Sequence, residues 1–175
     1  MQTVHNLAPA VGAPGMLFDD KEGNDIVSCI AGEDLQPGRW VELASSDVKT
    51  GPATVQLMQQ TTSTCAPYGV VVRDQQREAN NWPDNSSQGI KSGTRVAVLR
   101  RGRIFVERDS ADTASVARFD TPKIMHSSTN SAKRGMMTQA AASTAAGAEV
   151  TAQTVCQVWQ DCGTSGLLVM EVFVK

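Results

Sequence analysis

The stretch Thr-Arg-Val-Ala-Val-Leu-Arg-Arg-Gly-Arg-Ile-Phe-Val-Glu-Arg, residues 94–108, decides the fold class of this chain. Apolar residues fill positions 96–99 before the Arg101-Gly102 dipeptide and positions 104–106 after it. Short runs rich in Val, Ile and Phe that are interrupted by glycine are typical of β-strands. We therefore predict two paired strands here, with Arg101-Gly102 as the break between them.

Similar segments occur along most of the chain. Further strands are predicted at residues 25–31, 39–43, 54–58, 68–73, 122–126, 150–160 and 167–174, each bounded by Gly, Pro, Asn, Asp or Ser. The last two form a closing hairpin. No amphipathic helical pattern persists over a dozen residues, and we expect loops at the polar stretch 74–93 and the low-complexity stretch 138–149. Roughly nine short strands predict an all-β fold, a single β-sandwich or barrel-like domain.

Two strands show which side chains should be buried. In the final strand, alternate residues are apolar and share one face: Leu168, Met170, Val172 and Val174. In the strand at 39–43, Trp40 shares a face with Glu42, and the opposite face carries Val41 and Leu43. Only 5% of the residues are aromatic. The core must therefore consist mainly of aliphatic side chains and methionine.

Residues 1–20 differ from the rest of the chain. Two prolines and two glycines interrupt this segment, which disfavours both a helix and a central strand. We predict an extended N-terminal arm over residues 1–20, followed by an all-β partner-binding domain over 21–175. The arm's apolar side chains are the predicted partner-binding residues: Val4, Leu7, Val11, Met16, Leu17 and Phe18.

Composition excludes several classes of function. A net charge of −2 lacks the basic footprint of a nucleic-acid-binding protein. No apolar run approaches the roughly 18 residues of a membrane span. The first residues have no basic or hydrophobic region typical of a secretory signal, so we expect synthesis in a cytoplasm.

The residues that could bind metal lack the necessary spacing. The four cysteines form no Cys-x-x-Cys pair, and the two histidines, His5 and His126, are far apart in sequence. The acidic residues between 19 and 34 lack the alternation of a calcium loop. We therefore expect no metal and no cofactor. The cysteines are interpreted as free, buried thiols, with a Cys156–Cys162 disulfide as the alternative.

A catalytic site is not predicted either. His126, next to two serines at a strand end, lacks a Gly-x-Ser-x-Gly motif, and we expect an ordinary, partly solvated histidine. A cluster of basic residues lies on the paired strands: Arg95, Arg100, Arg101, Arg103 and Arg108. These arginines either protect an edge strand from aggregation or bind an acidic surface on a partner protein.

The order of these segments resembles the structural cement protein family of tailed bacteriophages. The resemblance rests on segments 13–19 around Pro14-Gly15, 31–41 with Glu33-Asp34 and Pro37-Gly38, 69–72, 93–106, 117–138 and 155–174. It implies a non-enzymatic virion protein, made in the host bacterial cytoplasm, that reinforces junctions between major capsid proteins on the capsid surface. It also implies a homo-oligomer, with a trimer as the first choice and a dimer as the second.

Two other functions are compatible with an all-β chain. A carbohydrate- or receptor-binding β-sandwich from a phage fibre or cell surface would use Trp40, Trp82 and Trp159 as stacking platforms. A small hydrolase would use His126. Each alternative requires its aromatic or catalytic side chains to be exposed together, which the structure can test.

Overall fold

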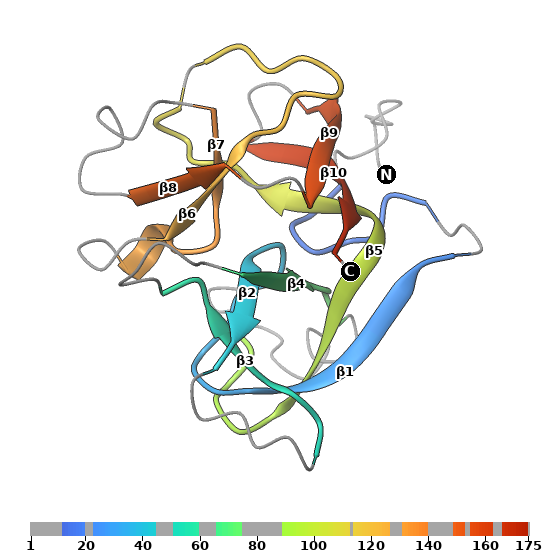
Figure 1. The fold of residues 1–175 in the computed structure, drawn as a ribbon, viewed down its shortest axis with the longest axis vertical. Helices are drawn as coiled ribbons and strands as arrows, with labels where there is room; N and C mark the ends of the chain where they lie inside the picture. Colours follow the sequence, from blue (N-terminus) through green and yellow to red (C-terminus); the bar gives the residue numbers. More distant parts are fainter. Residues whose placement is uncertain are drawn as a thin grey trace, which may run out of the picture.

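The structure is a computed structural model that describes residues 12–19, 23–44, 51–59, 66–74, 89–112, 114–126, 131–139, 149–152, 155–162 and 166–174. The described residues form ten β-strands and one short 3-10 turn, η1 (Ser131–Lys133), which confirms the all-β prediction. No helix among them is long and apolar enough to cross a membrane. Figure 1 shows a barrel in the lower half of the view and a hairpin and small sheet above it.

The barrel is a closed ring of five strands. They are β1 (Asp25–Ala31), β2 (Trp40–Leu43), β3 (Thr54–Leu57), β4 (Pro67–Val71) and β5 (Arg95–Glu107). The order β1-β3-β2-β4-β5 closes because β1 also pairs with β5, from Asp25 opposite Arg101 to Ile30 opposite Arg95. All pairings around the ring are antiparallel except that of β1 with β3. Closure leaves these five strands without an open sheet edge in the ring.

Small and β-branched side chains fill the barrel. One buried cluster draws on all five strands and on the loops at residues 35 and 90: Cys29, Ala31, Leu35, Val41, Val55, Leu57, Val71, Ile90, Val96 and Val98. The Leu35 and Ile90 backbones exchange two hydrogen bonds, of 2.8 and 2.7 Å, which brings both loops onto the barrel. Burying each large aliphatic side chain stabilises the fold by roughly 1.5–3 kcal/mol.

Strand β5 corrects one sequence prediction. Residues 95–107 form one continuous strand, so the expected break at Arg101-Gly102 is wrong. Gly102 has a φ of +132°, and a Cβ there would lie 2.2 Å from Asn24 Oδ1. The glycine therefore lets β5 bend while it remains paired. The first half of β5 pairs with β1 and β4, whereas the second half pairs with β10 (Leu167–Phe173).

The C-terminal region forms two units instead of one hairpin. Strand β9 (Cys156–Asp161) pairs with β10, as predicted, and continues the barrel's sheet beyond β5. Strand β8 (Glu149–Ala152), which we expected to be the start of β9, joins a separate antiparallel sheet. That sheet has the order β7-β6-β8, with β6 (Lys123–His126) between β7 (Met137–Thr138) and β8.

A second core lies between the barrel and these upper strands. Leu168, Met170 and Val172 are buried in it, with Val174 packed against it, which confirms the predicted inner face of the last strand. Trp40 is fully buried in this cluster, whereas Val41 lies in the barrel cluster. Strand β2 is therefore covered on both faces at these positions, which is why Trp40 and Val41 are both buried although they point in opposite directions.

Candidate functional site

The second half of the predicted arm is paired with β5. The Gly15 amide donates to the Phe105 carbonyl at 2.8 Å, the Phe105 amide donates to Met16 at 2.9 Å, and the Phe18 amide donates to Arg103 at 2.9 Å. Leu17 forms an antiparallel bridge with Ile104. Residues 15–18 thus extend the sheet beside β5, on the edge opposite β10.

The side chains of this segment differ in exposure. Leu17 packs against the second core, and Met16 is half-buried, with its sulfur accepting a hydrogen bond from the Ala13 amide at 3.3 Å. Phe18 is 37% exposed, and its ring centroid lies 5.7 Å from that of Phe105. The other three predicted partner-binding residues, Val4, Leu7 and Val11, lie outside the described residues.

Gly12 marks the point at which the described chain reaches this face. A Cβ on Gly12 would lie 2.4 Å from the Phe105 ring, so the backbone crosses the ring where only glycine fits. Such close approach fixes the position of residue 12 relative to β5. Gly12 and residues 15–18 therefore both lie against β5.

Arg103 connects this segment to the hairpin. Its guanidinium forms ion pairs with Asp19 at 2.9 Å and Glu171 at 3.4 Å, and its central carbon lies 3.5 Å from the centroid of the Trp159 ring. The Arg103 side chain is only 16% exposed. A guanidinium stacked on an indole and paired with two carboxylates is held in one position, because each contact restricts a different direction.

A second arginine lies by the same tryptophan. The Arg118 guanidinium is 5.1 Å from the Trp159 ring centroid, and its Nε donates to the Trp159 carbonyl at 3.1 Å. The Phe119 ring meets Trp159 edge-on, with centroids 6.2 Å apart. The outer face of β5, β10 and β9 therefore carries aromatic rings and guanidinium groups. We call this surface the aromatic–arginine face, and it comprises Phe18, Arg103, Phe105, Arg118, Phe119 and Trp159.

Sequence reasoning missed this face because its members come from four separate segments. One signal was available in β5 itself. Arg101, Arg103 and Phe105 alternate with Gly102, Ile104 and Val106, so one side of the strand is buried and the other carries charge and an aromatic ring. The neighbours of Arg103 on the hairpin could not be read from the sequence, because they depend on the β5–β10–β9 pairing.

The topology contradicts one of the two interpretations of the arginine cluster and leaves binding of an acidic partner surface as a prediction. Strand β5 is central, so the interpretation of these arginines as protection of an edge strand is wrong. Arg108 is buried in ion pairs, and Arg100 lies over the Tyr68 ring at 5.0 Å. Arg101 is exposed at the bend of β5. The arginines thus form several separate contacts and no single basic stripe.

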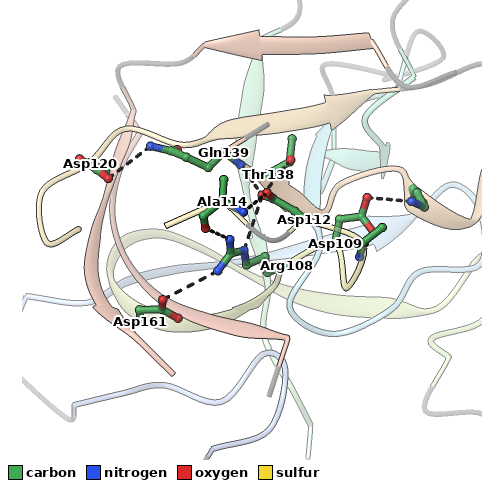
Figure 2. Close-up of polar contacts among 10 residues, drawn as sticks. Arg108, Asp109, Asp112, Ala114, Asp120, Thr138, Gln139 and Asp161 are labelled. Carbon is green, nitrogen blue, oxygen red and sulfur yellow. Dashed lines mark hydrogen bonds and ion pairs between the residues drawn. The ribbon is translucent and has the colours of Figure 1, made fainter. Parts of the chain in front are cut away.

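A buried polar network joins β5 to the small sheet (Figure 2). Asp112 accepts hydrogen bonds from the Gln139 amide at 2.6 Å, the Thr138 hydroxyl at 3.0 Å and the Ala114 amide at 3.0 Å. Its carboxylate also lies 3.6 Å from Arg108 Nε. Burial alone would raise the pKa of Asp112, but these hydrogen bonds and the Arg108 charge outweigh it and lower the pKa.

The same network continues toward β9 and the turn before β6. Arg108 reaches Asp161 at 3.8 Å and donates to the Ala114 carbonyl. The Gln139 side chain donates to Asp120 at 3.2 Å, so one residue connects the Asp112 carboxylate to the 117–120 turn (Figure 2). Lys133 pairs with Asp109 at 2.7 Å on the other side.

A second polar connection holds η1 on the barrel. The Arg39 guanidinium bonds to Glu107 and donates to the carbonyls of Ala132 at 2.7 Å and Arg134 at 2.9 Å. Arg134 in turn pairs with Glu33 at 2.7 Å. Burial lowers the pKa of the Arg39 guanidinium, and the charge of Glu107 opposes that effect.

Of the residues that would serve the other functions, those that the structure describes do not lie together at an exposed site. Trp40 is buried, Trp159 lies under an arginine, and Trp82 lies outside the described residues. His126 is buried at the end of β6, whereas we expected partial solvation, and the two serines that follow it are outside the described residues. No group of three potential metal ligands occurs within the part of the chain that the structure describes. No disulfide joins Cys29, Cys156 and Cys162 to one another, and Cys65 is outside that part.

Comparison with known proteins identifies relatives of this fold. A family model described as "Structural cement protein (E217 gp24/Pam3 gp6)" matches residues 1–170. No curated protein sequence matches the chain. Among solved structures, a chain in "The capsid of Myoviridae Phage XM1" is similar, with a TM-score of 0.67, 14% identity and 98% of each chain covered. At that identity the similarity shows a shared fold.

Proposed function

Since the chain belongs to the family of phage structural cement proteins, we propose that it binds an assembled capsid at junctions between major capsid proteins and is anchored there by its N-terminal arm. Family membership establishes a structural role in the phage capsid and places the protein in the virion. The proposal adds the junction, the outer surface of the capsid and the segment that makes the contact.

One observation supports the arm as the anchor. Residues 15–18 are hydrogen-bonded to β5, and Asp19 is paired with Arg103, so the chain that precedes Gly12 starts from a rigid base. The arm's apolar residues Val4, Leu7 and Val11 follow that base toward the N-terminus. An extended segment binds a partner by adding to a sheet edge and placing alternate side chains in grooves. Burial of each large apolar side chain contributes roughly 1.5–3 kcal/mol before the cost of ordering is subtracted.

Met16, Leu17 and Phe18 have a narrower role in this proposal. Leu17 packs on the protein's own core, so it fixes the base of the arm. Phe18 is the more exposed of the described arm residues and is placed to touch the partner directly. Several copies acting together, as a trimer or alternatively a dimer, would increase the avidity of each arm. Mass photometry of the purified protein distinguishes these oligomers.

Deletion of residues 2–11 tests the anchor. Capsids that lack the protein are mixed with wild-type or truncated protein, and occupancy is measured by sedimentation and cryo-electron microscopy. The truncated protein should lose decoration but keep its circular dichroism spectrum and cooperative melt, because the deletion stops before the β5-paired segment. A variant of full length with Val4→Ser, Leu7→Ser and Val11→Ser controls for chain length and should behave like the deletion.

Salt dependence supplies a second readout. An apolar contact should change little between about 50 and 200 mM salt, whereas contacts to phosphates lose affinity steeply over that range. Wild-type occupancy by the deleted protein would show that the arm is not the anchor. A many-fold salt-dependent loss of wild-type binding would favour the exposed arginines as the main contact.

A further inference from the structure

We infer that Phe119, together with Arg118, is a second, preformed contact for the capsid: an aromatic knob that inserts into an apolar pocket bordered by carboxylates. This inference rests on the proposed function, since it names a further part of the surface that meets the capsid. It concerns the turn at residues 117–120, which lies beside β9 and ahead of β6 (Figure 1).

Phe119 combines two unfavourable features. Its side chain is 58% exposed, more than the other exposed large apolar side chains of the described residues, of which Leu43 at 44% is next. Its φ is +71°, and it is the one described residue other than glycine with a positive φ. Bulky side chains rarely adopt this left-handed conformation, and strained residues of this kind cluster at functional sites. The Phe119 ring packs against Trp159 at a centroid distance of 6.2 Å, yet most of its side chain stays in solvent, so burial does not account for the conformation.

The turn that carries Phe119 is nevertheless tightly fixed. The Phe119 amide donates to the Val158 carbonyl at 2.7 Å, and the Val158 amide donates to Asp120 at 2.8 Å. The Asp120 carboxylate accepts from the Ala117 amide at 2.8 Å and from the Gln139 side chain at 3.2 Å (Figure 2). An exposed aromatic ring on a fixed backbone loses little conformational entropy on binding. Such residues are typical hot spots of protein interfaces.

The positive charge of Arg118 indicates which groups should surround the capsid pocket that receives Phe119. Arg118 is exposed, and among the described residues no carboxylate lies within ion-pair distance of it. Its Nε donates to the Trp159 carbonyl at 3.1 Å, which holds this exposed guanidinium beside Phe119. Arginine beside an aromatic ring is suited to a pocket that is apolar within and acidic at its rim. A pocket of that chemistry on the major capsid protein is therefore the proposed partner.

The Phe119→Asn variant tests the knob. Asparagine tolerates a positive φ, so this change removes the ring and relieves the backbone conformation together. The full-length variant should melt at the wild-type temperature or higher, whereas its dissociation constant for capsids that lack the protein should rise about tenfold or more. A residue with a merely structural role would not show weaker binding with undiminished stability.

Matched variants separate the knob from other exposed residues and from the arm. Ile26→Thr removes a comparably exposed apolar side chain on β1, 43% exposed, and should leave capsid binding unchanged. Arg118→Glu should weaken binding, whereas Arg118→Lys should keep most of it. Undiminished binding by Phe119→Asn overturns this inference even where deletion of residues 2–11 abolishes binding. If Phe119→Asn weakens binding and deletion of residues 2–11 does not, the knob is a capsid contact and the arm is not.

Two further outcomes would also overturn the inference. If Phe119→Asn dissociates an oligomer of the free protein but each copy still binds capsids normally, the knob contacts a second copy of this chain. If the variant loses binding to a glycan array while capsid binding is unchanged, the knob is a sugar platform. Mass photometry and the array are therefore run on the same samples.

Discussion

Replacement of Asp112 by alanine should destabilise the protein more than replacement of any exposed carboxylate. The side chain is 2% exposed, and its two oxygens receive three hydrogen bonds, from Gln139, Thr138 and Ala114. Its ion pair with Arg108 adds a fourth interaction. Alanine would leave the donors of these three partly buried hydrogen bonds without their acceptor at the junction between β5 and the small sheet.

The magnitude follows from these unsatisfied groups. Breaking a buried ion pair by removing one partner costs about 3–5 kcal/mol, and each orphaned donor costs about 1–3 kcal/mol on its own. Because Arg108 keeps the Ala114 carbonyl and Asp161 as partners and the three hydrogen bonds are only partly buried, we expect the total to stay near the cost of the ion pair alone. A loss of about 3–5 kcal/mol would lower the melting temperature of a chain of this size by roughly 6–20 °C. Thr138→Val, which removes one hydrogen bond, should cost about 1 kcal/mol.

The pH dependence supplies an independent test of the same carboxylate. The pKa of Asp112 is lowered from its usual 3.8 in the folded protein, so its contribution is complete above that value and is lost as the pH falls through the lower folded pKa. Between roughly pH 4 and 2, wild-type stability should therefore fall more steeply than that of Asp112→Asn. Differential scanning fluorimetry across this range measures both, with Asp25→Asn, at an exposed position of β1, as the control. An Asp112→Ala variant that melts within about 2 °C of wild type, below the range expected for its size, would refute the argument.

Two other predictions concern the core. Gly102→Ala should lower the free energy of unfolding by about 1–3 kcal/mol in chemical denaturation, because φ is +132° and the new Cβ would meet Asn24; Gly51→Ala, in open space, should not. Equal stability of the two variants would mean that β5 does not need its bend. Burial raises the pKa of Cys156 to about 12, so maleimide at pH 8 should label it only after denaturation, as read by peptide mass spectrometry. Labelling of native Cys156 faster than half-buried Cys162 would contradict its burial.

Local pattern was sufficient to predict most strands, and tertiary pairing determined the rest. The segments at 25–31 and 167–174 are compact, bounded by turn residues and rich in β-branched or aliphatic side chains, and the structure has β1 and β10 there. Arg101-Gly102 could not be interpreted locally, because a glycine ends a strand or bends it according to what pairs on either side. Here β1 and β10 pair with β5 on both sides of Gly102 and hold the strand continuous.

The candidate surface was predicted less well for a related reason. The apolar character of residues 1–20 was visible in the sequence, but the pairing of residues 15–18 with β5 was not, because an extended segment can add to any available edge. Trp159 was considered as an exposed platform, yet an arginine fifty-six positions earlier covers its ring. Such long-range stacking leaves no periodic trace in either segment. The sequence therefore indicated which apolar residues need to be covered. The strand topology determined that residues 15–18 are covered by β5 of the same chain.

Arg103 gives the two proposed contacts a common mechanical base. It pairs with Asp19 at the root of the arm and stacks on Trp159, whose ring edge meets Phe119. The base of the arm and the 117–120 turn are thus held on one sheet, so under the two proposals binding of either contact would bring the other to the capsid. Two modest contacts connected in this way bind far more tightly than either alone, provided that the spacing matches the partner. Loss of the Arg103 stack would then weaken capsid binding by loosening that spacing, although the Arg103 side chain itself is only 16% exposed.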